Sequence, residues 1–148
     1  MKSILFTLSM ISLLLLGNNL KASSRMGSLP EIKNNTSKDY VEVLYFHGKQ
    51  RCVTCVAIQK LTKELIEADF AEQIKNGKVV FKEIDISTKE GEKIADKYEV
   101  TWSSLFVNKW QDGKETKNNM TDFGFSNAKS SPDVFKAGVK KKINELLK

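Results

Sequence analysis

Residues 41–55 read VEVLYFHGKQRCVTC and contain both cysteines of this 148-residue chain. The apolar run 41–46 predicts a buried strand, and an amphipathic stretch begins within the cysteine motif. Cys52 therefore lies where a helix is expected to begin, so unpaired backbone N–H groups and the helix dipole favour its thiolate. Cys55 follows one helical turn later, close enough to form a disulfide and to resolve a mixed disulfide. The stretch predicts a dithiol that exchanges electrons, with Cys52 as nucleophile and Cys55 as resolving thiol.

Two other uses of the cysteine pair remain open. A structural disulfide is common in exported proteins, but such a bridge stabilises by closing a long loop, and this pair would close a very short one. A metal site is the second alternative, because His47 lies five residues before Cys52. The local sequence supplies no fourth ligand for it. We therefore expect neither a bound metal nor another cofactor, and we favour the redox interpretation.

Three side chains upstream of the pair are candidates for lowering the pKa of Cys52. Lys49 and Arg51 add positive charge just before it, and a nearby cation favours a thiolate. His47, the single histidine, could tune the sulfurs, move a proton or act as a metal ligand. The alternative for His47 is a half-exposed loop residue at the end of a strand.

The N-terminus predicts export. A basic start at Lys2 precedes a short apolar run, residues 4–16, which is the pattern of a secretory signal and is too short to span a bilayer comfortably. Small residues at 22–24 favour cleavage after Ser24, and cleavage after Ala22 fits the pattern nearly as well. We therefore expect a periplasmic or otherwise extracytoplasmic protein, tethered to the membrane if the signal is uncleaved.

The predicted organisation has three parts. A signal peptide occupies residues 1–24, and a flexible leader rich in serine, asparagine and lysine occupies residues 25–39. Residues 40–148 are enough for one domain with one core. The net charge of +6 is spread over mixed lysine and glutamate, which favours solubility and argues against a nucleic-acid partner.

The hydrophobic pattern predicts the order strand, helix, strand, helix, strand, strand, helix within residues 40–148. This order indicates an α/β domain with a mixed sheet and helices on both faces. The dithiol falls at the carboxyl end of the first strand, where open α/β sheets place their active sites. The expected elements are a strand at 41–46, a helix at 54–71, a strand at 79–86, a helix capped by Ser87 or Thr88 and extending to Tyr98, a strand at 104–110, a strand from Glu115, and a helix starting with a Ser131 cap and Pro132.

With a dithiol on that topology, residues 40–148 resemble the thioredoxin superfamily. The residues that carry the resemblance are the motif Cys52-Val53-Thr54-Cys55, the strand 81–86 and the segment 98–106. The resemblance implies a thioredoxin-like fold with a four-stranded sheet and a redox-active disulfide. It also implies thiol–disulfide oxidoreductase-like activity with a redox partner protein, which we expect to be membrane-bound.

The chain departs from the thioredoxin pattern near the cysteines. Thioredoxins carry a cis-proline facing the sulfurs, and the matching position here is Ser104. Because a cis bond before a residue other than proline is costly, we expect a trans Ser103–Ser104 bond. Tyr45 or Phe46 falls where thioredoxins keep a buried acid, so the acid–base group for Cys55 is unassigned. Trp102, Ser103 and Ser104 are candidate substrate-binding residues.

Trp102 has two interpretations. Its ring could stack on an aromatic substrate or cover the disulfide, and it could equally be an ordinary aromatic at the rim of the core.

Three segments resemble a narrower bacterial group of exported thioredoxin-like proteins: 45–48, 100–105 and 118–123. That group is described as a nitrophenyl compound nitroreductase subunit associated with arsenic-resistance operons. The resemblance implies a role in electron delivery or in the reduction of nitroaromatic compounds, together with a second subunit. The expected substrate is a small aromatic or disulfide compound. Two alternatives remain: a thiol module that binds a soft metal or arsenite, and an adaptor subunit with a structural disulfide.

Overall fold

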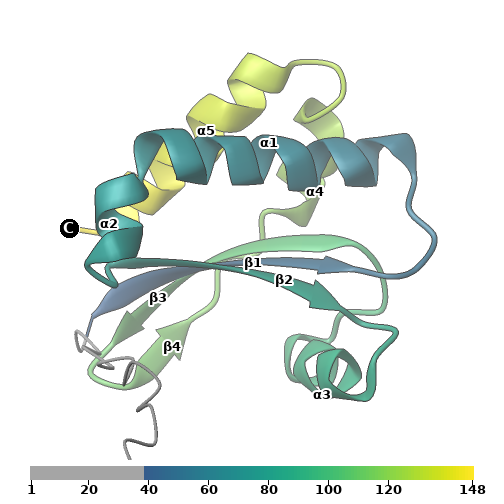
Figure 1. Ribbon diagram of the computed structural model, residues 1–148, viewed down its shortest axis with the longest axis horizontal. Coiled ribbons are helices and arrows are strands. Elements are labelled where there is room, and N and C mark those ends of the chain that lie inside the picture. The colour runs from purple at the N-terminus through teal and green to yellow at the C-terminus, as the bar shows by residue number, and fades with distance from the viewer. Residues whose placement is uncertain (1–38) are drawn as a thin grey trace, which may run out of the picture. The chain divides into compact units, whose positions relative to one another are not determined.

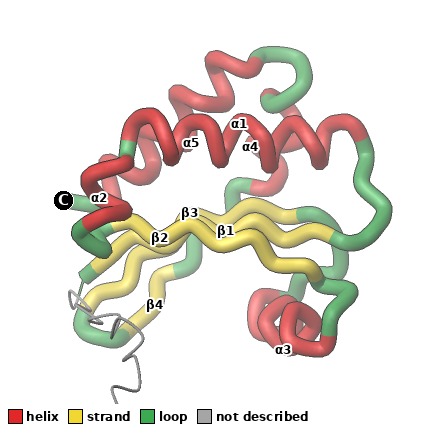
Figure 2. The backbone as a smooth tube through the Cα atoms, in the orientation of Figure 1, coloured by secondary structure: helices red, strands yellow, loops and turns green. Residues whose placement is uncertain are grey.

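The computed structural model describes residues 39–148, so the predicted signal peptide and nearly all of the predicted leader lie outside the described residues. No helix within residues 39–148 is long and apolar enough to cross a membrane. The elements, shown in Figures 1 and 2, are β1 (Tyr40–His47), α1 (Val53–Asp69), α2 (Ala71–Lys75), β2 (Val79–Asp85), α3 (Lys89–Tyr98), β3 (Ser104–Gln111), β4 (Lys114–Thr116), α4 (Thr121–Asn127) and α5 (Pro132–Leu146).

The four strands form one mixed sheet in the order β2-β1-β3-β4. β1 pairs in parallel with β2 and antiparallel with β3, and β4 pairs antiparallel with β3. Helices α1, α4 and α5 lie on one face of the sheet and α3 lies on the other (Figure 1). The predicted thioredoxin-like α/β fold, with a mixed four-stranded sheet and helices on both faces, is confirmed.

The central strand β1 is buried on both faces because it divides two hydrophobic clusters. Successive side chains of a strand point to opposite faces. Val43 and Tyr45 belong to the cluster that packs against α1 and α5, whereas Leu44 and Phe46 belong to the cluster under α3. This central position brings the carboxyl end of β1, and the loop that follows it, to the start of α1.

The helix predicted at 54–71 is two helices. α1 ends at Asp69, and Phe70 leaves the helical conformation with a φ of −126° before α2 begins. Phe70 is buried, so its side chain anchors the junction in the core. The other two predicted helix starts agree with the observed ones. Thr88 caps α3, with its hydroxyl accepting the N–H of Gly91. Pro132 is the first residue of α5, although the Ser131 side chain makes no capping bond.

The segment after β4 differs most from the prediction. β4 is only three residues long, and the chain then follows β3 through backbone bonds from Val107 N–H to Asn118 O (2.9 Å) and from Met120 N–H to Leu105 O (2.8 Å). The Asn119 side chain accepts the N–H of Thr121 at 2.9 Å, an Asx turn that starts α4. The adjacent asparagines, 118 and 119, therefore join a sheet edge to a helix that the hydrophobic pattern does not predict.

Candidate active site

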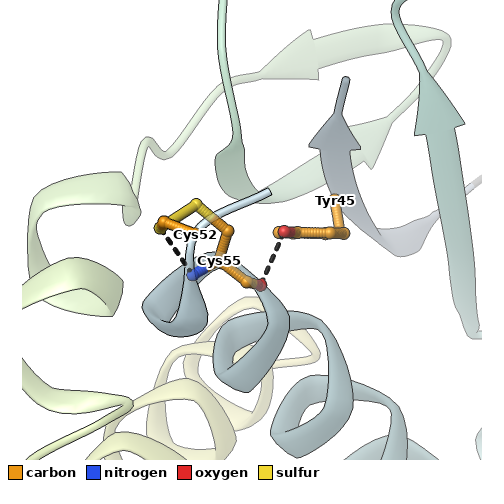
Figure 3. The surroundings of a disulfide bond; sticks show 3 residues. All are labelled: Tyr45, Cys52 and Cys55. Atoms are coloured by element: carbon orange, nitrogen blue, oxygen red, sulfur yellow. Dashed lines mark hydrogen bonds between the residues drawn. A yellow bond between two sulfur atoms is a disulfide. The ribbon is translucent and has the colours of Figure 1, made fainter. Parts of the chain in front are cut away.

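Cys52 and Cys55 form a disulfide at the start of α1 (Figure 3), with Cα atoms 5.1 Å apart. Cys52 is the N-cap residue of α1, and its sulfur accepts the backbone N–H of Cys55 at 3.1 Å. The sulfur thus takes the place of the side-chain oxygen that usually caps a helix. The first turn of α1 contains no acidic residue, so no carboxylate there opposes the helix dipole.

The two sulfur-bearing residues differ in exposure. Cys52 is exposed, whereas Cys55 is only 7% exposed. An incoming group can reach the first residue from solvent, and the second is sheltered beneath it. This asymmetry suits a pair in which one thiol attacks and the other resolves.

A pocket of about 380 Å³ opens beside the disulfide. It is formed by the start of α1, the β1–α1 loop, the segment after β2, the segment before β3 and helix α4. Among its lining residues are Cys52, Cys55, Ile86, Trp102, Ser103 and Phe125.

Trp102 and Phe125 form a stacked pair at this pocket. Their ring centroids are 5.4 Å apart with planes 15° from parallel, and Trp102 stays 62% exposed. Val53 and Val56 on α1 are also exposed, at 70% and 46%. The disulfide is therefore bordered by apolar surface. Phe125 is not among the residues predicted for the site, because it lies on the unpredicted helix α4.

Two of the three predicted substrate-binding residues line the pocket: Trp102 and Ser103. The Ser104 hydroxyl is instead directed to the carbonyl oxygen of Trp102, 3.3 Å away. No cis peptide bond occurs within the described residues, so the Ser103–Ser104 bond is trans as expected.

The three predicted tuning residues have different surroundings. The guanidinium of Arg51 donates to the Gln59 side chain, and Lys49 is exposed. His47, at the end of β1, lies beside the Tyr45 ring with centroids 6.0 Å apart. The part of the chain that the structure covers holds no group of three histidine, cysteine or acidic side chains able to bind a metal ion.

Tyr45, which the resemblance offers together with Phe46 as an occupant of the buried-acid position, has a specific contact in the structure. Its hydroxyl donates to the carbonyl oxygen of Cys55 at 2.7 Å (Figure 3). Burial raises the pKa of Tyr45, while a hydrogen bond from Ser103 and the charge of Arg51 act in the opposite direction. The group beneath the disulfide is thus a neutral hydroxyl.

Comparisons with known proteins give only distant structural likeness. No family model and no curated protein matches the chain. Solved structures that resemble it include thioredoxin from Fasciola hepatica (19% identity, 72% of this chain and 81% of that one, TM-score 0.45) and oxidised thioredoxin O2 from Arabidopsis thaliana (19%, 74% and 76%, 0.45). A thioredoxin from Thermus thermophilus is 15% identical, with coverage of 70% and 76% and a TM-score of 0.42.

These values carry no argument about function, and the fold assignment rests on the strand order and the helix positions. A cysteine pair at the start of the helix that follows the central strand of this fold fits a thiol–disulfide oxidoreductase-like role.

Proposed function

We propose that this protein is an exported thiol–disulfide redox protein that cycles between a Cys52–Cys55 dithiol and disulfide. The observation that carries the proposal is the placement of the exposed residue Cys52 at the N-cap of α1, with the Cys55 N–H directed at its sulfur. A hydrogen bond to a charged acceptor is stronger than one to a neutral acceptor, so this donor favours the thiolate over the thiol.

The reaction proceeds in two exchanges. The Cys52 thiolate attacks a substrate disulfide, forms a mixed disulfide and releases one substrate thiolate. The Cys55 thiolate then attacks the Cys52 sulfur and releases the second substrate thiolate, while the two protons of the dithiol pass to the released thiols. The protein ends oxidised and is returned to the dithiol by a partner with its own dithiol, which we propose is membrane-bound.

Cysteine variants test this mechanism. Cys55→Ser leaves the attacking thiol without its resolving partner, so mixed disulfides should accumulate and appear as adducts by mass spectrometry. Cys52→Ser should abolish exchange without forming adducts. Turnover of the Cys55→Ser protein at the normal rate would contradict a two-thiol cycle.

Export rests on the N-terminal sequence. Expression of the full chain followed by fractionation should place it outside the cytoplasm, with residues 1–24 removed when the N-terminus is read by mass spectrometry. Recovery of the intact chain in the cytoplasm would refute this part of the proposal.

From the resemblance to the nitroreductase-subunit group we also propose a small aromatic substrate. Trp102 supports it, because this residue lines the pocket beside the disulfide and stays 62% exposed although its ring is stacked on Phe125, and an aromatic substrate can stack on such a ring. Reduction of a nitro group to nitroso takes two electrons and two protons from the dithiol, and one oxygen leaves as water. Reduced protein mixed with nitrobenzene should then lose its two thiols. If the thiols persist in nitrobenzene but are oxidised by a disulfide substrate in a parallel reaction, only the disulfide-exchange function stands.

A further inference from the structure

Tyr45 joins the central strand to the turn that carries the dithiol. It lies near the carboxyl end of β1, is fully buried and donates its hydroxyl hydrogen to Cys55 O at 2.7 Å (Figure 3). A phenylalanine ring would fill the same space in the core, so what the hydroxyl adds is its hydrogen bonds. It accepts from Ser103 and Arg51, and it donates to Cys55, the contact that reaches the dithiol turn directly.

The backbone at Cys55 makes two hydrogen bonds to Cys52. The N–H of Cys55 donates to the sulfur of Cys52 at 3.1 Å. Its carbonyl group shares a peptide unit with the N–H of Val56, which donates to Cys52 O at 3.0 Å. A bond to one end of a peptide unit polarises the bond at the other end. The Tyr45 hydroxyl thus fixes the backbone of Cys55, from which the sulfur and the carbonyl oxygen of Cys52 each receive a hydrogen bond, directly or through the adjoining peptide unit.

The charged groups near Tyr45 leave its phenol neutral and able to donate a hydrogen bond. Arg51 and Glu83 are the charged groups that act on the phenol, and the His47 ring lies beside it. The phenol keeps its proton, so it donates a hydrogen bond without placing a negative charge beneath the sulfurs. A carboxylate in the same place would oppose formation of the thiolate.

We propose that Tyr45 is a positioning residue for thiol–disulfide exchange: its hydroxyl fixes the first turn of α1 so that the Cys55 N–H stays directed at the Cys52 sulfur. The proposal rests on the redox function above. A thiolate exists only in the reduced form, and it gains more from this N–H than the disulfide sulfur does. Loss of the hydroxyl therefore destabilises the reduced form relative to the disulfide.

Tyr45→Phe removes the hydroxyl and keeps the ring. In thiol/disulfide buffers the variant should shift three- to tenfold toward the disulfide, which corresponds to a reduction potential lower by about 15 to 30 mV at about 30 mV per tenfold change. The alkylation rate of reduced Cys52, followed against pH, should show a raised pKa. Tyr98→Phe is the matched control, because Tyr98 is a hydrogen-bonded tyrosine under the opposite face of the sheet.

The control should lose stability and leave the thiol–disulfide equilibrium unchanged. If Tyr45→Phe also loses stability but keeps the wild-type equilibrium and Cys52 pKa, the hydroxyl is merely structural and the proposal is wrong. A shift toward the reduced form would also overturn it.

A second variant keeps the test decisive if Tyr45→Phe fails to fold. 3-Fluorotyrosine at position 45 makes the hydroxyl a stronger donor, so the equilibrium should move toward the reduced form, and an unchanged equilibrium would refute the proposal. Failure of the proposed function looks different: the wild-type protein would then not exchange with any protein disulfide, whereas the variants could still be compared in small-molecule buffers.

Discussion

Replacement of Asn108 should show how much its buried amide contributes to the stability of the fold. This side chain is fully buried in β3. Its Nδ2 donates to the Glu115 carboxylate at 2.8 Å and to the Tyr98 hydroxyl at 3.3 Å, and its Oδ1 accepts the backbone N–H of Asn118 at 2.9 Å. The amide therefore fastens the chain just before α4, the helix that brings Phe125 to the disulfide.

The expected loss of stability follows from these three bonds. A bond to a charged carboxylate contributes about 1.5–3 kcal/mol and a neutral bond about 1 kcal/mol, while the long bond to Tyr98 adds little. Asn108→Ala should thus lower the free energy of unfolding by roughly 3 kcal/mol. For a domain of this size, that corresponds to a fall in Tm of roughly 10 to 20 °C.

Urea unfolding of the oxidised protein, followed by circular dichroism, measures the change. Asn118→Ala is the matched control: its backbone makes the important bonds, and its side chain donates only one long bond, to Thr116 O at 3.4 Å. It should change stability by less than about 0.5 kcal/mol. A loss below about 1 kcal/mol for Asn108→Ala, or equal losses for both variants, would refute the reasoning.

Three further outcomes are expected. Gly91→Ala should destabilise the protein by about 1–3 kcal/mol in urea, because a Cβ there would collide with the carbonyl oxygen of Asp85; unchanged stability would show that the turn can move. Phe125→Ala should remove the stack on Trp102, lower stability by about 1–2 kcal/mol and shift Trp102 emission to longer wavelength in a variant lacking the other tryptophan; an unmoved spectrum would mean that the rings do not stack in solution. Burial, and then the neighbouring carboxylate, raise the pKa of Tyr98 well above its usual value, so its neutral form is favoured in the folded state. Its contribution to the free energy of unfolding is therefore complete below a pH of about 10 and is lost as the pH rises further, because the tyrosine ionises first in the unfolded chain. Tyr98→Phe should reduce the loss of stability at alkaline pH. An unchanged slope of stability against pH would contradict this explanation.

The part of the site that depends on local pattern could be predicted from the sequence. The apolar run of β1 is typical of a buried strand, and the amphipathic stretch from Val53 is typical of a helix packed on one face. The junction of the two patterns by itself puts Cys52 at the start of a helix. The position of Trp102 just before β3 likewise indicates that its ring lies near the sulfurs.

The rest of the site depends on contacts between distant segments. α4 has seven residues, including Gly124, so it has little helical propensity and begins where backbone bonds to β3 and the Asn119 side chain start it. Phe125 could not be placed without it. From the sequence, Tyr45 and Phe46 are alternative occupants of the buried-acid position, and the bond of Tyr45 crosses from β1 to α1 and has no signal in the sequence.

The reduction potential of the Cys52–Cys55 pair tests the central claim most directly. Purified mature protein is equilibrated in thiol/disulfide buffers, and alkylated thiols are counted by mass spectrometry. The account predicts a value between about −120 and −270 mV, the range of proteins that exchange disulfides. A value below about −300 mV would identify a structural disulfide and contradict the redox function.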